Sequence, residues 1–210
     1  MNIDPVGAAI GFAVLLISLT IHEAAHAWTA DQLGDPTARR LGRVSLNPLV
    51  HIDWIGTVLL PLLAIFSRLH FIIGWAKPVP VNTRNLRHPR RDFMIVAAAG
   101  PISNLLQAFA AAAALRLMFG QITGPELGPL GTALFLAVYV NLLLAFFNLI
   151  PVPPLDGGNV LLGLLPPRLA ASYGQLRQYG FLVLYALLFT GLASRWISPP
   201  TNFFMRILIP

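Results

Sequence analysis

The sequence predicts an all-α polytopic membrane protein, and three observations support this fold class. Charged residues make up only 10% of the 210-residue chain, whereas roughly 25% is average for soluble proteins. Hydrophobic residues reach 56%, and the mean hydropathy is +0.71. Several apolar stretches are long enough to cross a hydrocarbon layer of roughly 30 Å as helices. The length suits one domain, so we expect residues 1–210 to form a single transmembrane domain.

Charge and cysteine content limit the possible partners and the possible metal ligands of the protein. The net charge of +6 and the pI near 10.8 would suit nucleic-acid binding. However, the basic residues flank apolar segments, where they face anionic lipid and determine topology. We therefore expect a lipid bilayer and no nucleic acid as a partner. The chain has no cysteine, so any metal site must use nitrogen and oxygen ligands.

The first apolar segment, residues 6–30, is long enough to span the bilayer. It follows Met-Asn-Ile-Asp-Pro, which contains no basic residue, and it exceeds the core of a signal peptide. We therefore expect it to be retained. The next stretch, residues 31–53, is polar and rich in turn residues, and its arginines place it on the inner side of the membrane.

Residues 54–75 are apolar but interrupted by Pro61 and then by Arg68 and His70. The uninterrupted part, residues 55–67, is short for a full span and suits a re-entrant or interfacial segment. The residue pattern leaves open whether it spans fully or re-enters.

The following segment contains Pro78 and Pro80, which forbid helix and favour extended backbone. Val79 and Val81 would then share one side of a strand. We expect a small membrane-associated β-hairpin region built from about residues 40–50 and 76–82.

Three further spans are predicted. Residues 93–119 form one, interrupted early by Gly100-Pro101, and residues 130–150 form the next. Residues 179–192 form a last span. The tail over residues 195–210 mixes apolar residues with proline, and its pattern gives no placement.

The first span contains His22, Glu23 and His26 in its second half. Residues four apart lie on one face of a helix, so both imidazoles can bind one metal ion, with the glutamate beside them. This His-Glu-x-x-His spacing is that of zinc peptidases, in which the glutamate acts as a base. A chance occurrence satisfied by neighbouring side chains is the alternative. Ionisable groups within a bilayer are costly and usually functional, which favours the metal site.

Asp156 is the best candidate for a third ligand. It is the only acidic residue after Glu126 and follows a span in a turn of prolines and glycines. If residues 54–75 crossed fully, Asp156 would lie on the membrane face opposite the histidines. If that segment re-enters, Asp156 reaches the inner side together with them. A turn-forming aspartate that caps its own backbone is the alternative, and His51 is a competing ligand or supporting residue.

The distribution of basic residues agrees with the second topology. It places ten of the 14 basic residues inside: Arg39, Arg40, Arg43, Lys77, Arg84, Arg87, Arg90, Arg91, Arg168 and Arg177.

Five motifs together resemble the site-2 protease family of intramembrane zinc metalloproteases, in its compact prokaryotic form. They cover most of the chain from His22 to Gly158 and occur in the family's order: His22-Glu23-Ala24-Ala25-His26, Asn47-Pro48-Leu49-Val50-His51-Ile52-Asp53, Lys77-Pro78-Val79-Pro80-Val81-Asn82, Gly100-Pro101-Ile102-Ser103-Asn104, and Asn148 through Asp156-Gly157.

The resemblance implies a three-helix catalytic core with additional helices and one zinc ion held by His22, His26 and Asp156. It implies Glu23 as the base and Asn148 as a donor to the scissile carbonyl or its oxyanion. Val79 and Val81 would pair with the substrate as an added strand. Asn104 either contacts substrate or bonds between helices. No PDZ or CBS segment is apparent, so substrate choice would rest on the membrane core or on partners.

The predicted function is hydrolysis of a peptide bond in or near a transmembrane segment of a membrane-protein substrate. We expect an integral multi-pass protein of a bacterial or archaeal cell membrane, with its active site towards the cytoplasm and with regulatory membrane partners left open. Two alternatives are a metal-ion transporter, which would need polar groups in residues 6–17 as well, and a non-catalytic scaffold that binds transmembrane helices.

Overall fold

The computed structural model describes residues 5–59, 76–120 and 127–209, and within these ranges the fold is all-α, as predicted. The described part contains no strand. The α-helices, in chain order, are α1 Pro5–Gln32, α2 Thr37–Arg40, α4 Pro89–Phe119, α5 Pro129–Asn148, α6 Asp156–Leu164, α7 Pro167–Gln175, α8 Gly180–Phe189 and α9 Leu192–Leu208. Short 3-10 turns are η1 Pro48–Val50, η3 Thr83–Asn85 and η4 Leu176–Tyr179, and a π-helical turn is η2 Trp54–Leu59.

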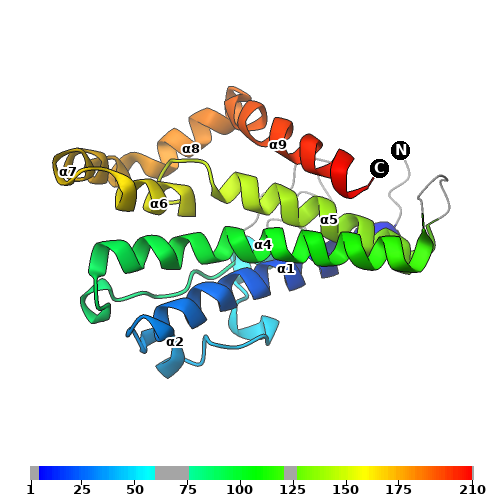
Figure 1. Ribbon diagram of the computed structural model, residues 1–210, viewed down its shortest axis with the longest axis horizontal. Coiled ribbons are helices and arrows are strands. Elements are labelled where there is room, and N and C mark those ends of the chain that lie inside the picture. Colours follow the sequence, from blue (N-terminus) through cyan, green and yellow to red (C-terminus); the bar gives the residue numbers. More distant parts are fainter. Residues whose placement is uncertain (1–4, 60–75, 121–126, 210) are drawn as a thin grey trace.

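Three long helices, α1, α4 and α5, form the centre of the molecule and pack against one another (Figure 1). Each is long and apolar enough to cross a membrane, which confirms three of the predicted spans. Helices α1 and α5 run in the same direction, and α4 runs opposite to both (Figure 1). The end of α1 and the end of α5 therefore lie at the same end of the bundle.

Helix α4 continues through Gly100-Pro101, where an interruption was predicted. Proline removes one backbone donor, but the neighbouring helices of a membrane bundle tolerate this loss. The Ser103 hydroxyl donates to the Gly100 carbonyl, 2.7 Å away, and so supplies one hydrogen bond within this turn.

The predicted β-hairpin region over residues 40–50 and 76–82 is wrong, because neither segment contains a strand. Pro78 and Pro80 lack the N–H groups that a ladder requires. A side chain joins the two segments instead: the Arg43 guanidinium donates to the carbonyls of Lys77 and Pro78. The Lys77 N–H donates to the His51 carbonyl at 2.9 Å.

The predicted re-entrant or interfacial segment lies mostly outside the described residues, which include only 54–59 of it. The residues on either side of it show how α1 and α4 are placed relative to each other. The Arg87 N–H donates to the Leu33 carbonyl at 3.3 Å, so the end of α1 and the approach to α4 meet at one end of the bundle. This arrangement gives α4 the direction that the predicted topology requires.

The C-terminal part differs from the prediction of one span over residues 179–192. Helix α8 ends before Gly191, which adopts a φ of 73°, and α9 continues at 71° to the α7–α8 arm. The pair counts as one further candidate span at most. The tail that the sequence left unplaced forms most of α9, which packs on α5: Phe204 stacks on Phe146 with ring centroids 5.7 Å apart.

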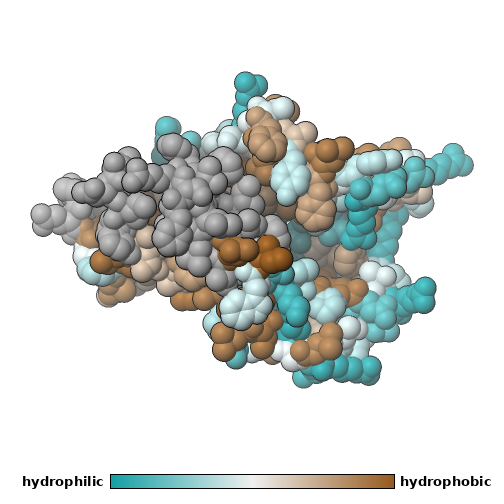
Figure 2. Space-filling model, turned by 180° about the vertical axis from the view of Figure 1, so that it is seen from behind, coloured by the Kyte–Doolittle hydropathy of each residue, from teal (hydrophilic) through white to brown (hydrophobic). Residues whose placement is uncertain are grey.

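The molecular surface suits a bilayer. Large apolar side chains are exposed on α4 and α8, namely Ile102, Leu106, Phe109, Phe181, Leu182 and Phe189. Hydrophilic residues gather at one end of the face in Figure 2, the end at which α1 finishes and α4 begins. Exposed apolar side chains along the helices and hydrophilic residues at one end form the surface expected of a multi-pass membrane protein.

Candidate metal centre

The structure brings together three side chains from two distant parts of the sequence. Helix α1 supplies His22 and His26, and the first residue of α6 supplies Asp156. The Asp156 Oδ2 atom lies 3.2 Å from His22 Nε2 and 3.3 Å from His26 Nε2. One potential ligand atom from each residue lies within 4.8 Å of the others, and the two histidines are buried.

Both imidazoles are oriented by α4. The Nδ1 atom of His26 lies 2.7 Å from the Val96 carbonyl oxygen, which can only accept a hydrogen bond. The Nδ1 atom of His22 lies 2.6 Å from the side-chain oxygen of Asn104. In a neutral imidazole that donates from Nδ1, the Nε2 atom has a free lone pair. In their neutral form both histidines would thus direct lone pairs at Asp156.

The convergence of these lone pairs fits a cation. The two Nε2 atoms are 3.1 Å apart, and with both Nδ1 atoms protonated no hydrogen lies between them. Asp156 Oδ2 is buried and has no hydrogen-bond donor. Three electron-rich atoms without a donor among them repel one another unless a cation binds there. Two imidazole nitrogens and one carboxylate oxygen form a ligand set that suits catalytic zinc.

Gly100 of α4 keeps space at this cluster. A Cβ atom at this position would lie 2.3 Å from His26 Nε2 and 2.5 Å from His22 Cε1. Only a residue without a side chain allows α4 to approach the two histidines so closely. Close approach of α4 in turn places Val96 and Asn104 in hydrogen-bonding distance of the imidazoles.

The turn between α5 and α6 positions Asp156. A Cβ atom on Gly157 would lie 2.4 Å from the backbone carbonyl group of Leu149. The first turn of α6 therefore packs directly on the backbone at the end of α5. Ile150 and Leu155 of this turn are buried with Ala193 of α9. The hydrophobic contacts hold the turn, and the glycine allows α6 to lie against it.

Glu23 is 9% exposed and lies next to the two histidines in the sequence of α1. Its Oε2 atom accepts a hydrogen bond from the Val79 N–H at 3.0 Å. The segment that carries Val79 is held by the buried Arg43, which bonds the carbonyls of Lys77 and Pro78. The backbone of residues 77–79 therefore lies against the Glu23 side chain.

The remaining predicted residues lie as follows. Asn148 ends α5, and its Nδ2 atom donates to the Leu144 carbonyl at 3.0 Å. Asn104 is fully buried and bonds to His22 and to Asn141 of α5. Val81 is half-buried in the irregular segment after Val79. The structure therefore places Asn104 next to a histidine, whereas Asn148 bonds within its own helix.

Sequence reasoning missed Asn141 and Ser18, which are buried and linked by a hydrogen bond of 2.9 Å. One indication was available, because an asparagine in an otherwise apolar span is costly unless it is bonded. Arg43 was predicted only as a topology determinant. No pattern in the sequence indicated its buried contacts with residues 77 and 78.

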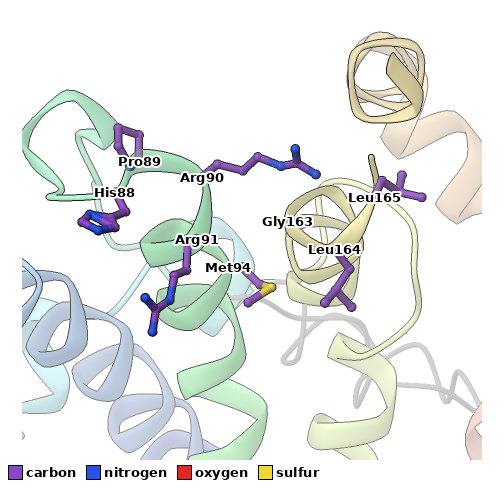
Figure 3. Close-up of a pocket in the computed structure, with 8 residues that line it drawn as sticks. All are labelled: His88, Pro89, Arg90, Arg91, Met94, Gly163, Leu164 and Leu165. Atoms are coloured by element: carbon purple, nitrogen blue, oxygen red, sulfur yellow. The ribbon is translucent and has the colours of Figure 1, made fainter. Parts of the chain in front are cut away.

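Among the described residues, the alternative ligand His51 and the further histidine His88 lie outside the three-residue cluster. His51 is buried, its Nε2 atom donates to the Ser45 carbonyl at 2.8 Å, and burial lowers its pKa. His88 lines a groove of about 650 Å³ between the start of α4 and the end of α6, together with Arg90 and Met94 (Figure 3). His70 lies outside the described residues.

Two buried histidines, one half-buried aspartate and an adjacent buried glutamate within a helical membrane bundle form the ligand set of a membrane-embedded metalloprotein. Comparison with known proteins identifies its family. Residues 118–191 match the description of peptidase family M50. The chain is 42% identical over 193 residues to "Putative zinc metalloprotease YwhC" of Bacillus subtilis (strain 168), an alignment that covers 90% of this chain and 84% of the relative.

Two mycobacterial relatives agree. The chain is 29% identical over 181 residues to "Putative zinc metalloprotease Rip2" of Mycolicibacterium smegmatis, covering 86% of this chain and 67% of the relative. A protein with the same name from Mycobacterium tuberculosis (strain H37Rv) is 30% identical with the same coverage. No solved structure gives a significant match. The chain belongs to peptidase family M50, the site-2 protease family, and is a metalloprotease.

Proposed function

We propose that the protein is an intramembrane protease that hydrolyses a peptide bond in or near a transmembrane segment of a membrane-protein substrate. It would hold one zinc ion per chain through His22, His26 and Asp156, with Glu23 as the general base. One observation supports this assignment above all others: three potential ligand atoms converge within the membrane bundle beside a buried glutamate.

Bound zinc would polarise the scissile carbonyl and lower the pKa of a water molecule towards neutrality. The chain's own residues do the rest. Glu23 accepts the proton of the attacking water and later gives it to the leaving amine. The Val79 N–H holds the Glu23 carboxylate by one oxygen, so the other oxygen is available for this proton.

Asn148 would donate to the oxyanion. Its amide has two hydrogens, and the Leu144 carbonyl uses one of them. The second hydrogen is therefore available to a substrate oxygen. Because Asn148 is the last residue of α5, its side chain lies where the turn to Asp156 begins.

The substrate would bind in extended form. A peptide bond within a transmembrane helix is protected by the helix's own hydrogen bonds, so cleavage requires local unwinding. Residues 76–82 form no regular element. The Val79 N–H already bonds Glu23, so strand addition would use the Val79 carbonyl and the backbone groups of Val81. A transmembrane substrate with helix-destabilising residues near the inner face suits this site. Regulatory membrane partners would act on how such a substrate reaches it.

The active site would face the cytoplasm. The end of α1 that holds His26 is also the end where α4 begins and where hydrophilic residues gather (Figure 2). An excess of arginine and lysine marks the cytoplasmic side of a membrane protein. The relatives come from bacteria, which supports a bacterial cell membrane as the location.

A pair of variants tests the proposal. Glu23→Gln should abolish cleavage of a membrane-protein substrate, while the purified protein still contains one zinc ion per chain by elemental analysis. His26→Ala should lose both the zinc and the cleavage. Cleavage by metal-loaded Glu23→Gln protein would refute the base assignment, and full zinc retention by His26→Ala would refute the ligand set.

A further inference from the structure

A chain of buried polar side chains leads from His22 into the centre of the bundle and back to α1. Asn104 of α4 contacts His22, Asn141 of α5 contacts Asn104, and Ser18 of α1 contacts Asn141. Asn104, Asn141 and Ser18 are 0–2% exposed. Buried amides are costly unless they are bonded, and here each amide bonds on both sides.

A backbone carbonyl at Asn141 fixes which group donates and which accepts in this series of hydrogen bonds. The Asn141 side chain faces the carbonyl oxygen of Ala137 at 2.9 Å. A carbonyl oxygen can only accept, so the atom of Asn141 that faces it must be the NH₂ group. The same NH₂ group donates to Ser18 Oγ at 2.9 Å. The Asn141 oxygen must therefore point towards Asn104.

The orientation of the Asn141 amide determines that of the Asn104 amide. The Asn141 oxygen can only accept, so the group of Asn104 that lies 2.8 Å away must be its NH₂. The Asn104 oxygen must then face His22 Nδ1, which lies 2.6 Å away. A reversed Asn104 amide would place two acceptor oxygens against each other in a buried site.

We propose that Asn141 is a positioning residue for the metal centre, because it fixes through Asn104 which nitrogen of His22 carries the proton. With the Asn104 oxygen facing it, Nδ1 of His22 must donate, and Nε2 faces Asp156 with its lone pair free. If the Asn104 amide reversed, Nδ1 would accept, and the proton would move to Nε2, where it would oppose metal binding. This inference rests on the proposed zinc site.

His26 is oriented in the same way as His22, with Nδ1 donating, but by a different kind of partner. His26 obtains its orientation directly from the Val96 carbonyl, whose polarity cannot reverse. His22 meets a side-chain amide instead, and an amide can turn by 180°. The amide needs a partner that fixes its direction, and Asn141 supplies this direction from the Ala137 carbonyl.

Zinc affinity, measured by competition with a chromogenic chelator in detergent, tests the inference. Asn141→Leu should weaken zinc binding roughly 10-fold or more, as expected for a group that supports a metal ligand. Asn104→Leu should weaken it at least as much. The double variant should bind zinc no more weakly than Asn104→Leu, because Asn141 acts only through Asn104. Ser103→Ala is the matched control, since Ser103 adjoins Asn104 but bonds to the Gly100 carbonyl, and it should bind zinc like wild type.

Additive losses in the double variant, or wild-type affinity of Asn141→Leu, would overturn the inference. A purely structural role for Asn141 would lower the stability of the metal-free protein without this dependence on Asn104. The wild-type protein supplies a second test that needs no variant. Nitrogen NMR of the zinc-free, ¹⁵N-histidine-labelled chain should show a protonated Nδ1 and an unprotonated Nε2 on His22, and the opposite tautomer would contradict the inference.

The two proposals fail differently. If the wild-type chain bound no zinc, the proposed metal site itself would be wrong and the inference would fall with it. If wild type and Asn141→Leu bound zinc equally well, the metal site would stand and only the role of Asn141 would be lost.

Discussion

Asp35 is fully buried in the turn after α1, and its carboxylate accepts hydrogen bonds from three residues. Thr37 donates to it from its backbone and from its hydroxyl, and Asn82 and Asn85 donate from the segment before α4. This single side chain therefore joins the two ends of the loop that connects α1 with α4. Burial acts to raise the pKa of Asp35, but the hydrogen bonds outweigh it and lower the pKa below the ordinary value of 3.8.

The lowered pKa predicts an acid-dependent loss of stability. A group with a depressed pKa in the folded state contributes stability that is present above its unfolded pKa and is lost as the pH falls through its folded pKa. Asp35→Asn replaces one acceptor by a donor that faces the Asn82 N–H, so it should cost about 1–3 kcal/mol near pH 7. Thermal unfolding in detergent between pH 7 and pH 3 measures both effects. The variant should lose less stability than wild type below pH 4, and equal slopes would contradict this account.

The residue scale also shows what the sequence could predict of the site. His22, Glu23 and His26 followed from helical spacing, because a fixed period determines which residues share a face. Their roles, and those of Asp156 and Asn148, stay predictions until the variants are measured. Asn141 and Ser18 could not be found, since a single polar residue in an apolar span has no periodic partner and its contacts depend on the packing of three helices.

Packing of α4 on α1 is controlled at Gly100. The space that Gly100 leaves is taken up by the two imidazoles. Gly100→Ala should push α4 away from α1 and separate the imidazoles from Val96 and Asn104. We expect zinc affinity to fall at least 10-fold, the scale seen when the support of a metal ligand is lost.

Gly11→Ala is the matched control for this prediction. Gly11 lies in α1, and a Cβ there would meet only Leu136 Cδ1 at an ordinary 3.9 Å. Helix propensity favours alanine over glycine at both positions by about 1 kcal/mol. A Gly100→Ala protein with the zinc affinity of wild type would show that α4 does not need this close approach.

At the element scale, apolar length predicted the three central helices well. Regular elements in the loops could not be predicted equally, because Pro78 and Pro80 suggested extended backbone and yet removed the donors of a ladder. Helix α9 escaped prediction for a related reason: the mixture of apolar residues and proline gave no placement, and the helix continues through Pro199 and Pro200. Its packing on α5 offsets the lost hydrogen bonds.

The topology of the whole molecule is open to a direct test, because the chain has no cysteine. Single variants Arg84→Cys and Arg177→Cys should react with a membrane-impermeant maleimide only from the cytoplasmic side. Gly128→Cys, in the exposed approach to α5, should react only from the opposite side. Labelling in right-side-out and inverted vesicles distinguishes the faces. Reaction of all three variants from one side would contradict the arrangement of α1, α4 and α5.

Two independent constraints in the sequence bear on the arrangement of the whole molecule. The distribution of basic residues and the need for a third ligand at the depth of the histidines both favoured one topology. The structure brings Asp156 to His22 and His26. The angle between α8 and α9 could not be obtained in this way, since it depends on Gly191 and on contacts that no charge pattern reflects.

The separation of the cluster's members along the sequence has a consequence during biosynthesis. His22 and His26 enter the membrane with the first helix, whereas Asp156 leaves the ribosome only after α4 and α5 have been made. A partly synthesised chain therefore contains both imidazoles and Glu23 but lacks the carboxylate of Asp156. If these three side chains hold zinc as proposed, the nascent protein would stay inactive until the three central helices have been inserted.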